Sequence, residues 1–336
     1  MTTVAHPEGV GPRPFNTRRM GWSDLPEQAQ AHIVDLVGSP VAEVRSTAEG
    51  FSPGFAGIVQ CTDGSQTFVK ATSAIRHPHS IALGRREIVV NAALPAAVHA
   101  PVMEFSHDDG DWALAGFEVI DGGTPHLPWT ADGLEAALEA IADLSEVQVD
   151  AADGFRPFSE SLAEAFRYWG EFAALPTAEQ AARAAGREWG NWALAHADTL
   201  ATWEAEAPAA SAGNRLIHGD LRADNMVLDR AGDVWLVDWP HAEYGAPWVD
   251  LVGLLPSVEM QGGGPCAGHF REHALGSQVE HEELRALVTA IAGYFLLGSW
   301  TPAPEQIPTL RQFQFAQAGP ALRWLQSLEP SLLISR

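Results

Sequence analysis

Residues 216–238 read LIHGDLRADNMVLDRAGDVWLVD. Two apolar runs in this stretch, 226–229 and 234–237, flank a four-residue segment that contains turn-forming residues. Short apolar runs separated in this way are typical of a β-hairpin. We therefore predict two antiparallel strands joined by a loop at residues 230–233.

In the simplest register of this hairpin, Met226 lies opposite Val237 and Asn225 lies opposite Asp238, with Cβ atoms about 5 Å apart. An amide oxygen and a carboxylate at that distance can share one hard cation, and Mg²⁺ prefers such oxygen ligands. Asp220, five residues before Asn225, can accept a proton from a hydroxyl group while the metal holds a phosphate nearby. An Asp, an Asn and a second Asp in this order match the catalytic base and metal ligands of phosphoryl transfer.

The N-terminal part of the chain predicts a mostly antiparallel sheet. Asp-Gly pairs at 63–64 and 109–110 are strong signals for tight turns between strands. The expected elements are strands at 41–48, 57–62, 65–72, 102–107 and 112–120, a helix that begins at Ser23 or Asp24 and stops at Gly38, and a helix at 80–94.

The C-terminal part predicts helices. Residues 130–205 carry Ala, Glu and Leu at helical spacing, and apolar residues recur at helical intervals again from Glu280. Strands and helices are segregated along the chain, which indicates an α+β fold rather than an alternating βαβ chain. We expect an N-terminal arm at 1–22, a β-rich lobe at 23–121 and a helical lobe at 122–336.

The segment HGDLRADN at 218–225 resembles the catalytic loop of the aminoglycoside phosphotransferase and choline kinase group of small-molecule kinases. VDW at 237–239 and YGAPWVDL at 244–251 are similar to the segments that follow this loop in that group. The resemblance implies a protein-kinase-like, two-lobed fold that binds ATP and Mg²⁺ between its lobes. It assigns the catalytic base to Asp220, the metal ligands to Asn225 and Asp238, and structural support of the loop to His218 and Asp250.

The same resemblance requires a lysine on the third strand and a glutamate on the helix that follows it. Lys70, the only lysine in the chain, and Glu87 stand at these places. They would form the ion pair that orients the phosphates of ATP. By resemblance, backbone groups of Glu118 and Ile120 would hydrogen-bond adenine.

A glycine-containing loop between the first two strands would cover the phosphates. The segment GFSPGFAG at 50–57 supplies Gly54 and Gly57 for this role. The loop departs from the G-x-G-x-x-G spacing of protein kinases, and Pro240 stands where many relatives carry an acidic residue. No G-x-x-x-x-G-K-[ST] sequence occurs, which excludes a P-loop kinase.

Composition limits the partners of the protein. The formal net charge is −23, from 43 acidic and 20 basic residues, so the surface repels nucleic acid and attracts cations. Two cysteines make a disulfide framework implausible. The segment 1–22 lacks the apolar run of a signal peptide, and the apolar stretch 287–300 is shorter than the roughly 20 residues that span a bilayer. We expect a cytoplasmic protein without membrane or nucleic-acid partners.

The substrate is expected to be a small molecule with a hydroxyl group. An amine-bearing antibiotic such as an aminoglycoside is the first choice, which would make the protein an antibiotic-resistance enzyme. It would bind in a carboxylate-lined pocket that draws on Glu259 and acids near Glu280. The alternatives are a metabolic kinase for an amino sugar, sugar or amino alcohol, and a non-catalytic nucleotide-binding scaffold. Arg222 could contact substrate or γ-phosphate or pair with an acid, and Asp224 could reach the metal or stabilise its own loop.

Overall fold

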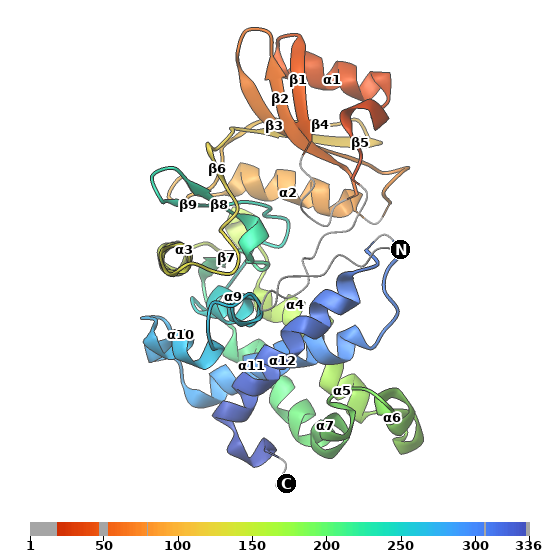
Figure 1. Cartoon of the computed structure of the whole chain (residues 1–336), viewed down its shortest axis with the longest axis vertical. Coiled ribbons are helices and arrows are strands. Elements are labelled where there is room, and N and C mark those ends of the chain that lie inside the picture. The colour runs from red at the N-terminus through yellow and green to blue at the C-terminus, as the bar shows by residue number, and fades with distance from the viewer. Residues whose placement is uncertain (1–18, 47–52, 79, 306, 334–336) are drawn as a thin grey trace.

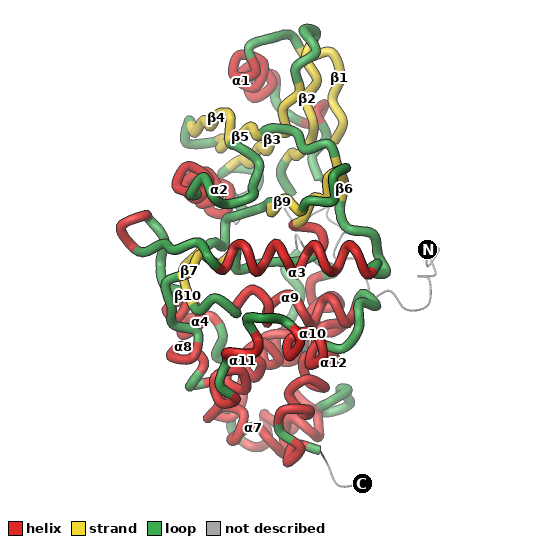
Figure 2. Tube along the Cα trace, turned by 90° about the vertical axis from the view of Figure 1, so that its left-hand side faces the viewer, coloured by secondary structure: helices red, strands yellow, loops and turns green. Residues whose placement is uncertain are grey.

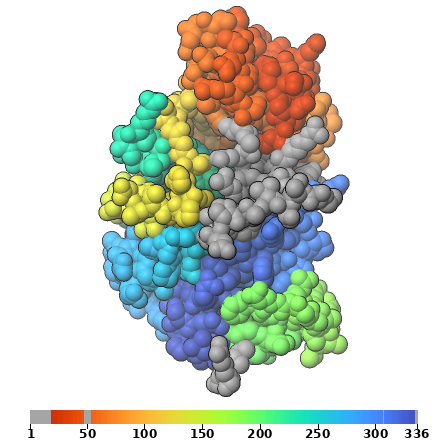
Figure 3. Space-filling model, in the orientation of Figure 1, coloured from red at the N-terminus to blue at the C-terminus, as the bar shows by residue number. Residues whose placement is uncertain are grey.

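The computed structural model describes residues 19–46, 53–78, 80–305 and 307–333. A β-rich N-terminal lobe lies above a larger helical lobe, and the chain passes from one to the other after the fifth strand. Figure 3 shows the side chains of the first lobe, in red and orange, stacked on the yellow, cyan and blue segments of the second. The expected α+β class, with a β-rich part followed by a helical part, is confirmed.

The N-terminal lobe is built on one antiparallel sheet with the strand order β1-β2-β3-β5-β4. Its strands are β1 (Val41–Ser46), β2 (Phe55–Cys61), β3 (Gln66–Ser73), β4 (Met103–Asp108) and β5 (Trp112–Phe117). The expected Asp-Gly turn joins β2 to β3: Gly64 has φ 91° and the Asp63 carboxylate accepts the N–H of Ser65. A left-handed conformation of this kind favours glycine.

Two helices cover opposite faces of this sheet. Helix α1 (Glu27–Val37) packs Ala29 and Ile33 against Val59 and Val69. It ends as expected at Gly38, which has φ 74°. The expected start at Ser23 or Asp24 is wrong, because these two residues belong to a short 3₁₀ turn (Trp22–Asp24) and Pro26 precedes the helix.

Helix α2 (Ile81–Ala93) agrees with the expected helix at 80–94 and lies between the sheet and the helical lobe. Lys70 on β3 points toward it, since successive side chains of a strand alternate between faces and Val69 and Ala71 point toward α1.

The second lobe is mainly helical, as expected. Its helices are α3 (Ala131–Ser145), α4 (Phe158–Ala165), α5 (Tyr168–Ala173), α6 (Thr177–Ala184), α7 (Gly190–Glu204), α8 (Ala207–Ala210), α9 (Val249–Met260), α10 (Cys266–Glu272), α11 (His281–Ser299) and α12 (Leu310–Leu328). Long helices α11 and α12 pack side by side, and Figure 2 shows α3 crossing the lobe beneath the strand β9 (Val234–Leu236). No described helix has the length and apolar character that a membrane span requires.

The hairpin expected at 226–237 is present as β8 (Met226–Asp229) and β9, but its register differs from the expected one. Met226 lies opposite Leu236, and Val237 donates its N–H to the carbonyl of Asn225. The turn is one residue tighter because the Asp229 carboxylate accepts the N–H groups of residues 231–233. Asn225 is therefore opposite Val237, and Asp238 is the next residue along.

Two further pairings set the position of this hairpin. β6 (Gly122–Gly123), the first segment after the N-terminal lobe, pairs with β8. β7 (Arg215–Ile217), which leads into the segment 218–225, pairs with β10 (Glu243–Gly245). The division of the chain at 121/122 stays a prediction, and the pairing of β6 with β8 is compatible with it.

Candidate active site

Lys70 projects from the centre of the sheet toward the helical lobe. Its neighbours across the strands are Ala56 and Ala115, which leave space for a long side chain. Its Nζ lies 2.6 Å from Oε1 of Glu87 on α2 and 2.9 Å from Oδ1 of Asp238, which follows β9. One ammonium group thus connects the sheet, α2 and the hairpin of the second lobe.

The charges in this cluster stabilise one another. Burial disfavours the charge of Lys70, but the carboxylates of Asp238 and Glu87 outweigh it and raise the pKa of the amine. Burial alone would raise the pKa of Asp238, yet the charge of Lys70 and its hydrogen bond hold that pKa well below the usual range. Lys70 and Asp238 are both ionised at neutral pH. Lys70 therefore faces two acidic side chains at once.

Helix α9 supports the segment 218–220 through hydrogen bonds. The carboxylate of Asp250, in the first turn of α9, accepts the N–H groups of His218 at 2.7 Å and Gly219 at 2.9 Å. Gly219 has φ 79°, and a Cβ there would lie 2.5 Å from the carbonyl oxygen of His241. A larger residue is therefore excluded at this turn.

The buried imidazole of His218 connects this loop to the hairpin. Its Nε2 donates to the carbonyl of Val237 at 2.9 Å, and its Nδ1 accepts the N–H of Asp220 at 3.3 Å, an assignment that follows from the hydrogen-bond network. Burial lowers the pKa of His218 to about 4, so the ring is neutral. Burial also raises the pKa of Asp250 to about 6, although two backbone N–H groups oppose this shift. Both residues have the contacts of structural supports.

Asp220 belongs to a second charged cluster. Its Oδ1 accepts a short hydrogen bond from Nη1 of Arg222, and the same guanidinium binds both carboxylate oxygens of Asp224 at 3.0 and 2.9 Å. Asn225 donates its amide N–H to the carbonyl oxygen of Asp220 at 2.7 Å. Of the roles left open for Arg222 and Asp224, the structure shows pairing with acids and stabilisation of the loop.

The predicted metal ligands offer suitable atoms. Because the Asn225 nitrogen donates to Asp220, its amide oxygen is the atom available as a ligand. Asp238 is an ionised carboxylate with φ 69°, a left-handed conformation that breaks the alternation of the strand before it. Hard oxygen donors among several acidic side chains suit Mg²⁺. The residues therefore fit this ion, although the predicted reason, a directly opposed Asn225–Asp238 pair, is wrong.

The glycines predicted to cover phosphates lie at the start of β2. The structure describes the loop only from residue 53 onward, so the segment 50–52 is outside the described residues. Gly57 is inside β2, opposite Val69, where a Cβ would lie 2.9 Å from a backbone oxygen of β1. A Cβ at Gly54 would lie 2.4 Å from the carbonyl oxygen of Ala71. The expected loop therefore ends earlier than predicted, and close strand packing already requires both glycines.

The connection between the lobes has a defined backbone pattern. Glu118 donates its N–H to the carbonyl of Val102 at 3.0 Å, and the Ile120 carbonyl accepts the N–H of Gly122 at 3.0 Å. The strand predicted to continue to residue 120 ends at Phe117. The two residues predicted to contact adenine are thus in the irregular segment that follows β5.

Two aromatic residues of the helical lobe that the sequence did not single out lie near the segment 218–225. The guanidinium of Arg222 stacks over Phe313 of α12, 5.9 Å from the ring centroid. Burial and, after it, the charge of Asp220 raise the pKa of Tyr294 on α11. Tyr294 interrupts an aliphatic helical face in the sequence, which is the one signal that could have singled it out.

Glu259, one of the acids predicted to line a substrate pocket, already has partners. Oε1 of Glu259 pairs with Arg323 at 2.7 Å, and Oε2 accepts the N–H of Cys266. Glu280 precedes α11, fourteen residues before Tyr294, or about 21 Å along a helix axis. That Glu280 and the acids near it line a pocket beside Asp220 stays a prediction.

The family model described as the phosphotransferase enzyme family matches residues 58–287. No curated protein sequence matched the chain.

Similar solved structures include a thermostable mutant of aminoglycoside phosphotransferase APH(4)-Ia with ADP and hygromycin B (16% identity, TM-score 0.56, 92% of this chain and 100% of that chain). Spectinomycin phosphotransferase APH(9)-Ia with ADP and spectinomycin is similar at 13% identity and TM-score 0.56, over 92% and 99% of the two chains. The streptomycin–ATP–APH(2″)-IIa ternary complex is similar at 13% identity and TM-score 0.53, over 90% and 99%. At sequence identities of 13–16%, these similarities show a shared fold and nothing more.

Proposed function

The chain belongs to the phosphotransferase enzyme family, and from that premise we propose that it transfers the γ-phosphate of ATP to a hydroxyl group of a small molecule in a Mg²⁺-dependent reaction. The observation that carries the proposal is the contact of Lys70 with both Glu87 and Asp238. It joins the N-terminal sheet to the hairpin beside Asp220. Membership in a family of enzymes argues against the alternative of a non-catalytic scaffold.

In this reaction Lys70, oriented by Glu87, contacts the ATP phosphates. Asn225 and Asp238 would hold Mg²⁺, which supplies positive charge to the phosphate oxygens. Asp220 is 35% exposed at its side chain, so a substrate hydroxyl can reach it, donate its proton to the carboxylate and attack the γ-phosphorus in line. Positioning and charge stabilisation provide most of the acceleration, and the base provides a smaller part.

The guanidinium of Arg222 forms an ion pair with the Asp220 carboxylate. We propose that Arg222 positions Asp220 and does not accept or donate a proton, since Asp224 holds the guanidinium on its other side. His218 and Asp250 position the loop through its backbone.

Adenine would bind at the connection between the lobes. The N–H of Glu118 and the carbonyl of Ile120 are already hydrogen-bonded. The carbonyl of Glu118 and the N–H of Ile120 therefore form the acceptor and donor proposed for the adenine edge. Gly54 directly precedes β2 and Gly57 lies inside it. Because neither residue has a side chain, they would allow the backbone at the start of β2 to approach the phosphates.

For the acceptor we propose an amine-bearing antibiotic such as an aminoglycoside. Two observations support this class: the net charge of −23, which attracts cations, and the likeness in fold to enzymes whose structures contain hygromycin B or spectinomycin.

A second candidate is a neutral sugar or amino alcohol. The surroundings of Asp220 favour it, because the partly buried ring of Tyr294 and the guanidinium of Arg222 provide an aromatic group and a cation there. Aromatic faces suit the apolar faces of a sugar ring or one ammonium group rather than several amines.

An ADP-release screen tests the function. The purified protein is incubated with ATP and Mg²⁺ against antibiotics, amino sugars and alcohols, beside Asp220→Asn and the control Asp233→Asn, an exposed acid on the same hairpin. We expect at least one acceptor to stimulate ADP release in wild type and control, and none to do so in Asp220→Asn. Equal stimulation in all three proteins would contradict the proposed site.

A further inference from the structure

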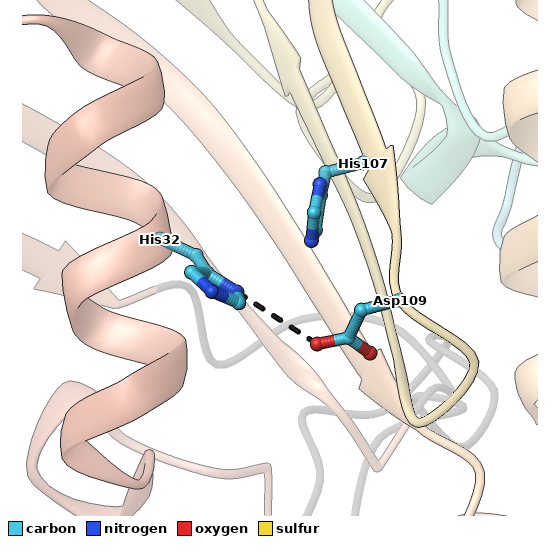
Figure 4. Close-up of side chains that lie close together, drawn as sticks. All are labelled: His32, His107 and Asp109. Atoms are coloured by element: carbon cyan, nitrogen blue, oxygen red, sulfur yellow. Dashed lines mark ion pairs between the residues drawn. The ribbon is translucent and has the colours of Figure 1, made fainter.

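A cluster of two histidines and an aspartate lies on the N-terminal lobe, away from the candidate active site. His32 belongs to α1, His107 to β4, and Asp109 to the turn between β4 and β5. Their ligand atoms all lie within 4.8 Å of one another. Figure 4 shows the three side chains converging from the helix on one side and the strand and turn on the other.

The cluster faces away from the nucleotide side of the sheet. His107 is paired with Leu114, and Leu114 is paired with Ala71. Paired residues share a face of a sheet, and Leu114 and Ala71 pack against α1. Lys70, one residue before Ala71, points to the opposite face. The proposed phosphotransfer does not use this cluster.

Two nitrogens in the cluster have unmet hydrogen-bonding capacity. His32 Nδ1 and His107 Nε2 are both buried, and neither has a hydrogen-bond partner within the described parts of the chain. The rings meet edge to face with centroids 4.8 Å apart. His32 Nδ1 lies 3.8 Å from Oδ2 of Asp109, which is too long for a hydrogen bond. Buried nitrogens of this kind are costly unless a partner binds them.

The carboxylate of Asp109 is fixed in place by its own turn. Its Oδ1 accepts the N–H groups of Trp112 at 2.7 Å and Asp111 at 3.0 Å. These bonds leave Oδ2 directed toward His32, as the dashed line in Figure 4 marks. The backbone hydrogen bond from Trp112 is the largest cause that lowers the pKa of Asp109, so the group is an anion. A carboxylate fixed by hydrogen bonds is typical of a metal ligand.

We propose that His32, His107 and Asp109 bind a divalent transition-metal ion, with Zn²⁺ the best match. Two imidazole nitrogens and one carboxylate oxygen are ligands that Zn²⁺ favours, and a fourth position remains for water. Because the three ligand atoms lie at most 4.8 Å apart, an ion centred among them would lie at most about 2.8 Å from each, so the side chains need to close by less than about 1 Å to reach zinc distances. His32 and Asp109 are 31% and 25% exposed at their side chains, which gives the ion access.

The alternative is a salt bridge between protonated His32 and Asp109. That pairing leaves Nε2 of His107 without a partner, whereas a metal ion satisfies both nitrogens and the carboxylate. Metal binding would also connect α1 to the β4–β5 turn. Arg85 of α2 already binds this turn, through Asp108 at 2.7 Å and the carbonyl of Gly110 at 2.9 Å. The ion would therefore connect α1 to the turn that also holds α2.

The test measures metal binding by the untagged full chain. The protein is stripped with a chelator and titrated with Zn²⁺ by calorimetry in excess Mg²⁺, which occupies the proposed active-site ligands. Co²⁺ then serves as a spectroscopic probe. We expect one Zn²⁺ per chain, a raised melting temperature with Zn²⁺, and a Co²⁺ absorption band without thiolate character, since both cysteines are buried elsewhere.

Matched variants locate the site. His107→Gln and Asp109→Asn each should weaken Zn²⁺ binding at least about tenfold and abolish the rise in melting temperature. Asn keeps an oxygen to accept from Trp112, so the turn can persist. His126→Gln, an exposed histidine outside the cluster, should bind as wild type does. If His107→Gln fails to fold, His32→Gln on the half-exposed side of α1 provides the same comparison.

Three results would overturn the proposal: no stoichiometric Zn²⁺ binding by wild type, unchanged affinity in the cluster variants, or equal loss in His126→Gln. The first would leave the salt bridge as the role of these residues. The readouts do not depend on catalysis, so failure here is distinguishable from failure of the proposed phosphotransfer.

Discussion

Replacement of Lys70 by Met should destabilise the protein in a pH-dependent way. The Lys70–Glu87 pair at 2.6 Å has a Coulomb energy of about 6 kcal/mol at an effective dielectric constant of 20. Most of this is offset by desolvation, but removal of Lys70 leaves the Glu87 carboxyl without its counter-ion and only 6% exposed. Loss of one partner of a buried pair costs about 3–5 kcal/mol, and the partial exposure of Lys70 favours the lower end, about 3 kcal/mol at pH 8.

The sign of the pH dependence follows from Glu87. Burial raises the pKa of this carboxyl in the folded protein, and without the ammonium group the pKa rises further. The folded variant then holds a proton that the unfolded chain releases, so its stability is highest below the unfolded pKa and falls as pH increases. The loss relative to wild type should be smaller at pH 5 than at pH 8.

Urea unfolding of four proteins measures this effect: wild type, Lys70→Met, Glu87→Gln and the double variant. Glu87→Gln removes the unpaired charge, so the double variant should be more stable than Lys70→Met by at least about 1 kcal/mol at pH 8. If single and double variants unfold alike at pH 5 and pH 8, Lys70 does not pair with Glu87 and the reasoning is refuted.

Three further predictions concern the site and its substrate. Asp238→Ala should lower kcat/KM for ATP at least about tenfold with the fold retained by circular dichroism; wild-type turnover would exclude Asp238 as a metal ligand. Because burial lowers the pKa of His218 to about 4, its neutral form stabilises the protein above about pH 6.5, and this contribution is lost as pH falls toward about 4. His218→Gln, which can keep both hydrogen bonds, should flatten that decline in unfolding free energy; an unchanged profile would show that His218 does not cause it. A polyamine acceptor should show a KM that rises with NaCl, because exposed charges are screened over about 8 Å at physiological ionic strength. The KM of a neutral sugar should not depend on NaCl in this way, and the KM for ATP is the control. If the best acceptor has no amine, the antibiotic-amine proposal is refuted.

Local sequence patterns were sufficient to predict most elements near the site. The Asp63-Gly64 turn fixed the strand that carries Lys70, and helical spacing after it placed Glu87 on α2. The single lysine of the chain is consequently where the resemblance required it, with Glu87 as its partner. These predictions depend on turns and periodicities that operate over few residues, which the sequence displays directly.

The register of the β8–β9 hairpin could not be predicted from local patterns. Its existence follows from two apolar runs, but its register depends on the Asp229 carboxylate binding three successive N–H groups of the turn. A shift of one residue in a strand moves a side chain to the other face. The left-handed backbone of Asp238 then brings its carboxylate to Lys70, a conformation that no pattern in the sequence indicates for a non-glycine residue.

Contacts between segments that are distant in the chain could not be predicted from the sequence either. Arg222 binds Asp220 and Asp224 within its own loop, but its stacking on Phe313 depends on how α12 packs. The start of α1 at Glu27 depends on Pro26 and on a short turn that uses Asp24. The surroundings of Glu280 likewise depend on how the long helix α11 packs in the helical lobe.

The central claim is that Asp220 acts in phosphoryl transfer at a site whose nucleotide is held by other residues. Single-turnover transfer from radiolabelled ATP to the acceptor found by the screen, with Asp220→Asn and the Asp233→Asn control, tests it most directly. We predict that Asp220→Asn transfers phosphate at least about 100-fold more slowly while its Kd for ATP stays within about threefold of wild type. A transfer rate equal to that of wild type and the control would contradict the account.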